Sequence, residues 1–211
     1  MRKIGKGIFI LSAVTMNFLA ASCSREVRIF NGENLDGWVC VLEEEVPAGA
    51  EPTFSVRDGM IHITGTPQGY LRTDRIFEDY TLTLEWRWND GRLDSGIFNR
   101  LQPGDRVWPT GIQFQMRTHD FGWLVSGVPL EGYTPDEKGM HRKPSLYDGD
   151  PQRPDGEWNE MKFVLKGTHY TVWMNGILIN ESKCDATSGY IALQSETCPM
   201  DVRNIRLVLN R

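Results

Sequence analysis

The sequence predicts an all-β protein built as a sandwich of two antiparallel sheets. More than ten short runs alternate apolar with polar residues, and 21 glycines and 11 prolines lie among them. The chain has no amphipathic helical stretch of useful length. Short strands at close spacing without helices are typical of β-sandwiches, and nothing in the sequence divides the chain into two halves. We therefore expect a single β-sandwich domain over residues 27–211.

The N-terminus has the composition of a bacterial targeting segment. Residues 1–6 are basic, and residues 7–19 form an apolar stretch too short to span a bilayer comfortably. Small residues then lead directly to Cys23, as in the lipobox of bacterial lipoproteins, where the cysteine is acylated. We expect a signal peptide over residues 1–22, a lipid on Cys23 and a tether over residues 23–26. An ordinary secretory signal that contains a cysteine is the alternative.

Charge and targeting narrow the range of partners. The formal net charge is −5 and no dense cluster of Lys and Arg appears, so nucleic acid is not an expected partner. A lipid-anchored protein would lie in the bacterial cell envelope, in the periplasm or at the outer membrane. It would contact the membrane through its anchor only. The sequence does not indicate whether the protein is a monomer or an oligomer.

The sequence of the first part of the domain predicts short strands separated by turns. Residues 27–30 and 38–42 are apolar runs on either side of a turn-rich segment. Residues 54–64 alternate on both sides of Asp58-Gly59, which is the signal for a β-hairpin. Another short strand is expected over residues 69–74.

The clearest strand patterns lie between residues 80 and 117. Residues 80–88 alternate Leu and Trp with Thr, Glu and Arg, and residues 111–117 alternate Ile, Phe and Met with Gln and Arg. Residues 95–100 form a strand between them. The polar side of the first and last strands carries hydrogen-bonding groups with few Lys or Ser. We interpret it as a ligand-binding face, with an ordinary solvated face as the alternative.

The last part of the chain starts with an irregular segment and returns to strands. Residues 118–156 are rich in Gly, Pro and Asp, and a loop of this length in a compact domain is usually functional or mobile. Asn175-Gly176 predicts a type I′ turn between two strands. The strands of this part are expected over residues 157–165, 170–174, 177–179, 189–194 and 202–209.

Cysteines and histidines give little sign of a metal or cofactor. Cys184 and Cys198 flank a predicted strand and are placed to pair at a sheet edge, but with Cys40 their number is odd, so at least one stays free. The chain has no Cys-x-x-Cys spacing and its histidines are scattered, so we expect no structural zinc. The sequence predicts no cofactor. A divalent metal held by Asp or Glu of residues 118–156 is the alternative.

Six motifs occur in the order found in a known family. They are FNGENLDGW (30–38), EWR (85–87) with SGIFNR (95–100), GEWN (156–159), NG (175–176), LQSE (193–196) and RNIR (203–206). Over roughly residues 27 to 209 the chain resembles the 3-keto-disaccharide hydrolase domain family of bacterial lipoproteins. The resemblance implies a concanavalin A-like jelly roll whose concave sheet holds a small-molecule carbohydrate. It also implies action on glycosides already oxidised to a ketone at C3.

The chain departs from the family at one position and lacks the usual glycosidase pattern. Many members carry Glu where Gln113 stands, so this chain lacks that carboxylate. It also lacks the Glu-x-Asp-x-x-Glu spacing of jelly-roll glycosidases, which disfavours simple hydrolysis of an unmodified glycoside. A 3-keto sugar needs less, because its ketone acidifies the hydrogen on C2. One general base and one group that stabilises the enolate are then enough.

Five ionisable residues are candidates for this chemistry. Glu85 is the expected base, with Arg87 on the same face to bind an oxygen or hold the carboxylate. His119, Asp120 and Glu196 are the other candidates for the base. A structural ion pair is the alternative role for Glu85 and Arg87. The alternative for His119 is a solvated histidine in a loop, and the alternative for Glu196 is an ordinary turn residue.

Five further residues are candidates for binding the sugar. Gln113, Gln115 and Gln194 offer neutral amides to hydroxyl groups. Arg100 ends its strand and would bind an oxygen if the sheet register turns it toward the ligand. Trp123 is the first choice for stacking on a sugar ring, among the loop aromatics Trp108, Trp123, Tyr133 and Tyr147.

These residues support an enzyme of carbohydrate catabolism as the first hypothesis. It would act outside the cytoplasm and cleave 3-keto-glycosides by hydrolase or lyase chemistry. A non-catalytic, lectin-like carbohydrate-binding lipoprotein is the alternative, favoured by Gln113. A third hypothesis is an adhesion module, against which the polar binding face counts.

Overall fold

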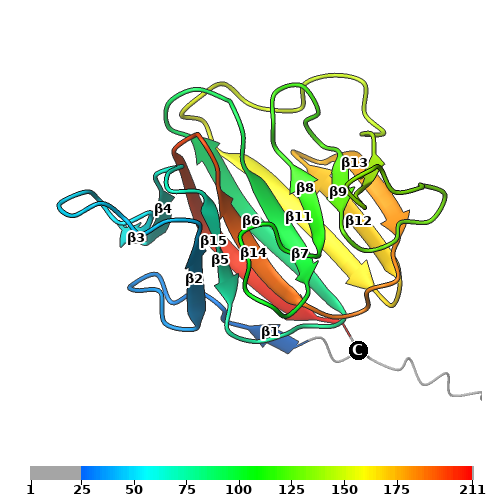
Figure 1. Cartoon of the computed structure of the whole chain (residues 1–211), viewed down its shortest axis with the longest axis horizontal. Coiled ribbons are helices and arrows are strands. Elements are labelled where there is room, and N and C mark those ends of the chain that lie inside the picture. Colours follow the sequence, from blue (N-terminus) through cyan, green and yellow to red (C-terminus); the bar gives the residue numbers. More distant parts are fainter. Residues whose placement is uncertain (1–24, 211) are drawn as a thin grey trace, which may run out of the picture.

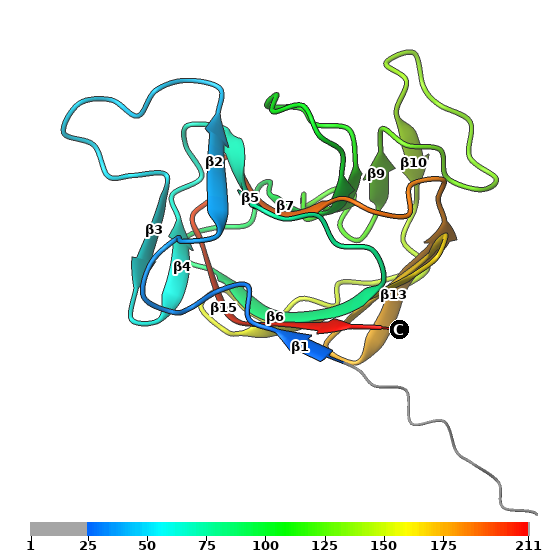
Figure 2. The ribbon, with the colours of Figure 1, turned by 90° about the horizontal axis from the view of Figure 1, so that it is seen from below.

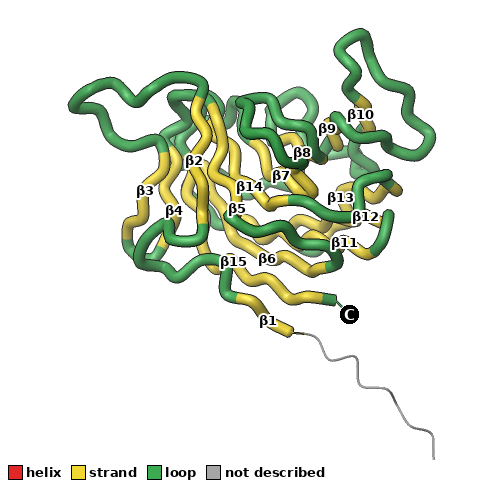
Figure 3. Tube along the Cα trace, turned by 60° about the horizontal axis from the view of Figure 1, so that its bottom comes forward, coloured by secondary structure: helices red, strands yellow, loops and turns green. Residues whose placement is uncertain are grey.

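The computed structural model describes residues 25–210, which form two antiparallel sheets packed face to face (Figure 1). Figure 2 shows the sheets as two layers. Figure 3 shows strands and loops without a helix in this part of the chain. The predicted all-β sandwich is therefore confirmed. Within residues 25–210, no helix has the length and apolar character needed to cross a membrane.

The two layers contain eight and seven strands. The eight-stranded sheet has the order β13 (Ile177–Lys183), β12 (His169–Met174), β11 (Asn159–Lys166), β6 (Tyr80–Trp88), β15 (Met200–Leu209), β4 (Met60–Ile63) and β3 (Phe54–Arg57), and β1 (Arg25–Val27) pairs with β15. The seven-stranded sheet has the order β10 (His141–Lys143), β9 (Leu124–Ser126), β8 (Ile112–Gln115), β7 (Gly96–Leu101), β14 (Tyr190–Ser195), β5 (Gly69–Thr73) and β2 (Trp38–Leu42).

Alternation along the strands produces the core between the sheets. Leu82 and Trp86 of β6 are fully buried, whereas Thr81 and Glu85 of the same strand are partly exposed on its other face. Phe114 of β8 joins the same core from the opposite sheet. Each fully buried apolar side chain of this size stabilises the fold by about 1.5–3 kcal/mol. The core therefore specifies which face of each strand turns inward.

Both predicted hairpin turns are present. Asp58 and Gly59 have φ values of 50° and 75°, and Asn175 and Gly176 have 49° and 80°. A type I′ turn requires positive φ at both central residues, which Asn, Asp and Gly tolerate best. These dipeptides thus fix the registers of β3 with β4 and of β12 with β13.

The two strands expected to share one polar face belong to different sheets. β6 pairs with β11 and β15, while β8 pairs with β7 and β9. Phe114 of β8 meets Phe163 of β11 edge to face across the core, with ring centroids 6.0 Å apart. Because both strands turn their apolar sides toward the same core, their polar sides face away from each other. The expectation of one shared binding face is therefore wrong.

The structure differs from the sequence prediction at the tether and in the 118–156 segment. Strand β1 starts at Arg25, so Arg25 and Glu26 belong to the sandwich and not to a tether. The 118–156 segment contains the short strands β9 and β10. The predicted signal peptide over residues 1–22 and the lipidation site Cys23 lie outside the described residues.

The cysteines of the described residues are free. Cys40 is exposed, and Cys184 and Cys198 are buried. The Cys198 Sγ atom accepts a hydrogen bond from the Leu93 backbone N–H at 2.9 Å, and the Cys184 thiol donates to the Ala186 carbonyl at 3.3 Å. The two buried thiols have separate hydrogen-bond partners, and the predicted Cys184–Cys198 disulfide does not form.

Loops border the outer face of the seven-stranded sheet. Figure 2 shows the loop between β2 and β3 rising on one side of this layer and the loop between β9 and β10 on the other. The segment between β7 and β8 is fixed to the same face, because Asp105 accepts two bonds from Arg72 of β5 at 2.8 and 2.9 Å. We call this surface the loop-bordered face.

Candidate active site

Three glutamines lie side by side on the loop-bordered face. Gln113 and Gln115 of β8 turn away from the core that buries Ile112 and Phe114, and Gln194 of β14 does the same. The exposed fractions of the three glutamines are only 8%, 6% and 3%. Buried amides of this kind need hydrogen-bond partners, so their arrangement is constrained.

Gly96 of β7 allows the glutamines of the two neighbouring strands to meet. A Cβ atom at this position would lie 2.6 Å from Gln113 Nε2 and 2.7 Å from Gln194 Oε1. Such distances are too short for real atoms, so any other residue would push the two amides apart. The missing side chain thus makes room for a contact across the intervening strand.

Hydrogen bonds join the three amides and two carboxyl groups into one row. Gln113 Nε2 donates to Oε1 of Gln115 at 2.6 Å and to Oε1 of Gln194 at 2.9 Å. Gln115 Nε2 donates to Asp94 Oδ1 at 3.0 Å, and Gln194 Nε2 donates to Glu196 Oε2 at 2.7 Å. We call these five side chains the amide row. It places one carboxyl group at each end of a line of neutral amides.

Backbone contacts hold the two ends of the row together. Asp94 lies two residues before β7 and Glu196 directly follows β14. Asp94 forms an isolated parallel bridge with Thr197. The thiol of Cys198 accepts the Leu93 N–H in the same region. The two carboxyl-bearing segments are therefore neighbours although about a hundred residues separate them in the chain.

Burial raises the pKa of both carboxyl groups. The pKa of Asp94 rises to about 6, with the nearby negative charge of Asp120 adding to the burial and Arg117 opposing it. The pKa of Glu196 rises to about 7, because burial and the charge of Asp94 outweigh Arg117 and the Gln194 hydrogen bond. Two carboxyl groups with different raised pKa values can serve as base and acid near neutral pH.

Arg117 supplies a positive charge beside both carboxyl groups. Asp120 accepts two hydrogen bonds from its guanidinium, one of them at 2.9 Å and the other to Oδ2. The Arg117 side chain is still 45% exposed, so it remains accessible to a ligand. A guanidinium held in this way can stabilise an oxyanion.

The amide row forms part of a cavity of about 520 Å³. This volume is within the range of small-ligand sites. Trp108 lines it with 53% of its surface exposed, which leaves an aromatic face free for a ring. The lining residues are Asp94, Arg106, Trp108, Pro109, Thr110, Gln113, Gln115, Arg117, Val125, Gly127, Lys138, Met140, Arg142 and Glu196. Four cationic and two carboxyl side chains in this set make the cavity suited to a reaction that develops negative charge.

Glu85 and Arg87 lie on the outer face of the eight-stranded sheet, away from the amide row. Glu85 accepts from Arg203 Nε at 2.7 Å and from Asn204 Nδ2 at 3.0 Å. Arg87 donates to Asp201 Oδ2 at 2.8 Å. Both residues are thus in ion pairs between neighbouring strands, which is the alternative role that the sequence left open for them. The structure does not bring them into the candidate site.

Arg100 is buried inside the protein. It has φ 52° at an irregular position of β7, and its side chain is fully buried. The guanidinium donates to the Ala186 carbonyl and, at 3.4 Å, to Cys184 Sγ. The register thus turns Arg100 away from the loop-bordered face, and its expected contact with a ligand is not supported.

His119 and Trp123 line a different hollow. It has a volume of about 430 Å³ and lies between the 118–123 segment and residues 144–149. His119 is exposed and Trp123 is half-buried. Asp120 also lines this hollow, and its carboxylate accepts from Arg117, which lines the cavity of the amide row. Of the predicted site residues, the structure brings together Gln113, Gln115, Gln194 and Glu196.

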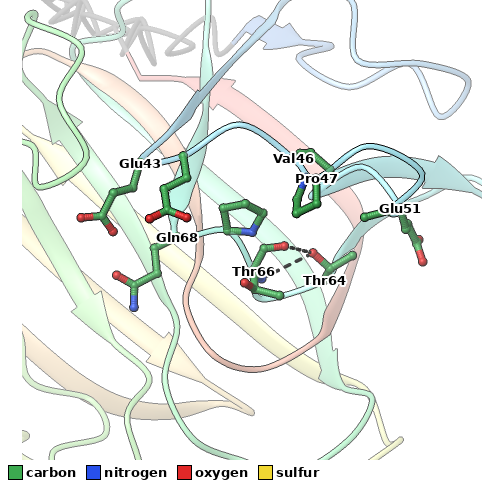
Figure 4. A pocket seen from close by; sticks show the side chains of 10 residues that line it. Glu43, Val46, Pro47, Glu51, Thr64, Thr66 and Gln68 are labelled. Atoms are coloured by element: carbon green, nitrogen blue, oxygen red, sulfur yellow. Dashed lines mark hydrogen bonds between the residues drawn. The ribbon is translucent and has the colours of Figure 1, made fainter.

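A further hollow of about 490 Å³ lies beneath the loop between β2 and β3 (Figure 4). Glu43, Glu44 and Glu51 line it and are all exposed. Figure 4 also shows Gln68 and a hydrogen bond between Thr64 and Thr66, 2.7 Å long. Exposed carboxylates are ordinary surface groups, so the amide row is the stronger candidate for chemistry.

Asp94 and Arg117 were not among the predicted site residues, and Trp108 was one of three loop aromatics placed behind Trp123. Asp94 is part of the polar break between two strands, and only its bridge with Thr197 brings it to Glu196. Its place just ahead of Ser95 and Gly96 was the available signal. Arg117 continues the Gln113, Gln115 alternation by one step, and that periodicity was sufficient to find it.

Two acidic side chains of the 118–156 segment form ion pairs with arginines. Asp120 accepts from Arg117, and Asp136 accepts from Arg142 Nε at 3.0 Å. Residues 25–210 contain no group of three or more His, Cys, Asp and Glu side chains placed to hold a metal ion.

Comparison with known proteins assigns the family. The model of the 3-keto-alpha-glucoside-1,2-lyase-like domain matches residues 25–208. The chain belongs to this family. The family named from the motifs is thus confirmed. The match covers nearly all of the residues that the structure describes. No curated protein matches the chain.

Solved structures show the same fold at low identity. A predicted glycosyl hydrolase from Parabacteroides distasonis is 18% identical, with a TM-score of 0.62 over 86% of this chain and 92% of its own. The endo-β-1,3(4)-glucanase SCLam of family GH16 is 13% identical, with a TM-score of 0.62 over 89% and 92%. The carbohydrate-binding module CBM66 from Bacillus subtilis is 10% identical, with a TM-score of 0.57 over 80% and 93%. These similarities confirm the predicted jelly-roll fold of this chain.

Proposed function

We propose that this protein cleaves the glycosidic bond of 3-keto-glycosides at the amide row. One observation carries the proposal: Asp94 and Glu196, both with raised pKa values, end one row of hydrogen bonds in a cavity with cationic walls. The family assignment supports a keto-glycoside as the substrate class. The geometry and the family thus point to the same chemistry.

The first step is removal of the hydrogen on C2. Asp94, with a pKa of about 6, is mostly ionised near neutral pH and acts as the base. The electron pair of the C2–H bond moves toward the C3 carbonyl and makes an enolate. Arg117 stabilises the negative oxygen, helped by the other cations of the cavity. A base of this kind contributes roughly 10²–10⁴ to the rate.

The second step breaks the C1–O bond. As the enolate electrons form the C1–C2 double bond, the aglycone leaves, and Glu196 donates a proton to its oxygen. With a pKa of about 7, Glu196 keeps enough of its proton near neutral pH to do so. Water then adds across the double bond: its oxygen bonds to C1 while the Glu196 carboxylate takes its proton. Protonated Asp94 returns its proton to C2, so both carboxyl groups regain their starting states.

Binding without catalysis is the second candidate function. The neutral amides of the row and the exposed face of Trp108 would also suit a carbohydrate-binding protein. A protein of this kind would hold the sugar but need no proton transfer at Asp94. Release of the aglycone therefore separates the two functions.

The test is aglycone release from a 3-keto-glucoside and from its unoxidised parent. Wild type is expected to release the aglycone from the keto sugar only. Asp94→Asn is expected to lose about 10²–10⁴-fold in kcat/KM, because the base is gone. Glu85→Gln is the matched control, since Glu85 lies on the other sheet. Binding of the keto sugar without release by a folded wild type would overturn the enzyme and favour the binding protein.

We also propose that the protein is a lipoprotein of the cell envelope. The proposal rests on the basic and apolar residues before Cys23 in the sequence. Labelling of the full chain with a fatty-acid analogue in a bacterial host is expected to be lost in Cys23→Ala. Labelling that survives this substitution would contradict the anchor at Cys23.

A further inference from the structure

We propose that Gln113 is a positioning residue whose amide sets the direction of every hydrogen bond in the amide row. In this role it leaves the amide nitrogen of Gln115 to donate to Asp94 and that of Gln194 to donate to Glu196. The catalytic consequence rests on the proposed function. The direction of the row itself does not.

The direction depends on what an amide can donate and accept. An amide nitrogen carries two hydrogens, and an amide oxygen carries none. Gln113 Nε2 has two acceptors, Gln115 Oε1 at 2.6 Å and Gln194 Oε1 at 2.9 Å. Gln113 is thus the central donor of the row. Gln115 and Gln194 use their oxygens for Gln113, so each must turn its own nitrogen outward.

The outward nitrogens reach the two carboxyl groups. Gln115 Nε2 lies 3.0 Å from Asp94, and Gln194 Nε2 lies 2.7 Å from Glu196. A donor directed at a carboxyl group favours its ionised form. One amide in the middle of the row therefore supports the ionised state of both groups at once.

A carboxylate at position 113 would reverse this arrangement. An ionised Glu only accepts hydrogen bonds, so it would face two amide oxygens at the present distances. To avoid this repulsion, Gln115 and Gln194 would have to turn their nitrogens inward. Their oxygens would then face Asp94 and Glu196, which would need a proton to donate in return. Gln113→Glu is therefore expected to favour the protonated forms of both carboxyl groups.

Other charged groups near the row are accounted for in the test. Arg117 and Asp120 act on Asp94 from the β8 side, and Arg106 and Lys138 line the cavity from loops and Arg142 from β10. None of these changes in Gln113→Glu. Gln68→Glu adds the same charge beneath the loop between β2 and β3, outside the amide row, and serves as the matched control (Figure 4).

The first measurement is the titration of the Asp94 and Glu196 carboxyl carbons by NMR without substrate. In Gln113→Glu both pKa values are expected to rise by about one unit or more, a tenfold increase in proton affinity. In Gln68→Glu they are expected to stay as in wild type. Unchanged values in a folded Gln113→Glu variant would overturn the proposal.

The second measurement locates the hydrogens directly and needs no variant. In a neutron structure of the wild type, both deuterons on Gln113 Nε2 are expected to point at the oxygens of Gln115 and Gln194. A Gln113 oxygen facing either neighbour would overturn the proposal even if Gln113→Glu did not fold. If the keto sugar is not cleaved, the proposed function fails while both measurements still decide the direction of the row.

Discussion

Asp94 and Glu196 are joined through three glutamines whose hydrogen bonds all run outward from Gln113 Nε2. The two carboxyl groups come from segments next to different strands, and burial raises the pKa of each. Burial of two ionisable groups without a full ion pair is unfavourable for stability. A fold that keeps this arrangement in a cavity has the features of a functional site.

Glu196→Gln is expected to remove the alkaline limb of the pH–rate profile. The wild-type kcat/KM on a 3-keto-glucoside should fall above a pH of about 7, because Glu196 then loses the proton that it donates. The glutamine cannot ionise, so the residual rate, lower by about 10²-fold, should stay level there. Rates measured across the pH range check this. An unchanged alkaline limb in the variant would assign that limb to another group.

The same substitution is expected to change how stability depends on pH. The folded state holds the Glu196 proton up to a pH of about 7, whereas its ordinary pKa is 4.5. Folded protein thus binds more protons than unfolded protein between these values, so the free energy of unfolding decreases as the pH rises. Glu196→Gln removes this decrease. Relative to wild type, it should gain on the order of 1 kcal/mol in urea unfolding at alkaline pH, and the gain should be absent under acidic conditions.

Glu85→Gln is expected to affect stability and leave catalysis intact. Burial raises the pKa of Glu85, but the hydrogen bonds from Asn204 and Arg203 outweigh it and hold the pKa below its usual range. The pair therefore stabilises at neutral pH and is lost as the pH falls through the folded pKa. We expect a loss of about 0.5–1 kcal/mol at neutral pH. A large drop in kcat/KM would show that Glu85 takes part in catalysis after all.

Gly96→Ala is expected to disrupt the amide row with little effect on the fold. The new Cβ would lie 2.6 Å from Gln113 Nε2 and 2.7 Å from Gln194 Oε1. It would also lie 2.9 Å from Gln113 Cγ, but all three atoms belong to side chains, so the two amides move apart and break their hydrogen bond. We expect about a tenfold or greater loss in kcat/KM with less than about 1.5 kcal/mol of destabilisation. Full activity in the variant would show that the row need not be continuous.

Trp108→Ala is expected to weaken sugar binding. Its ring is 53% exposed on the cavity wall, and stacking on another ring contributes about 0.5–1.5 kcal/mol. The KM or the dissociation constant should therefore rise by roughly 2- to 13-fold. Trp123→Ala is the control, because Trp123 lines a separate hollow. A larger effect from Trp123 than from Trp108 would place the sugar in that hollow instead.

The sequence by itself determined the fold class, the family and the inward face of the two strands with the clearest alternation. Alternation in residues 80–88 and 111–117 correctly separated core residues from polar ones, because burial of apolar groups has the same period as the strand. Asn175-Gly176 and Asp58-Gly59 identified hairpins for the equally local reason of positive φ. Gln113, Gln115, Gln194 and Glu196 were candidates on this basis.

Only the tertiary structure decided which polar faces belong together. Glu85 and Gln113 each lie opposite core residues of their own strand, but β6 and β8 are in different layers, so the two side chains point to opposite sides of the sandwich. Conversely, Asp94 meets Glu196 through a bridge between segments far apart in the chain. Strand periodicity carries no information on sheet membership or strand order. Those depend on how all strands pack around one core, and that packing assembled the site.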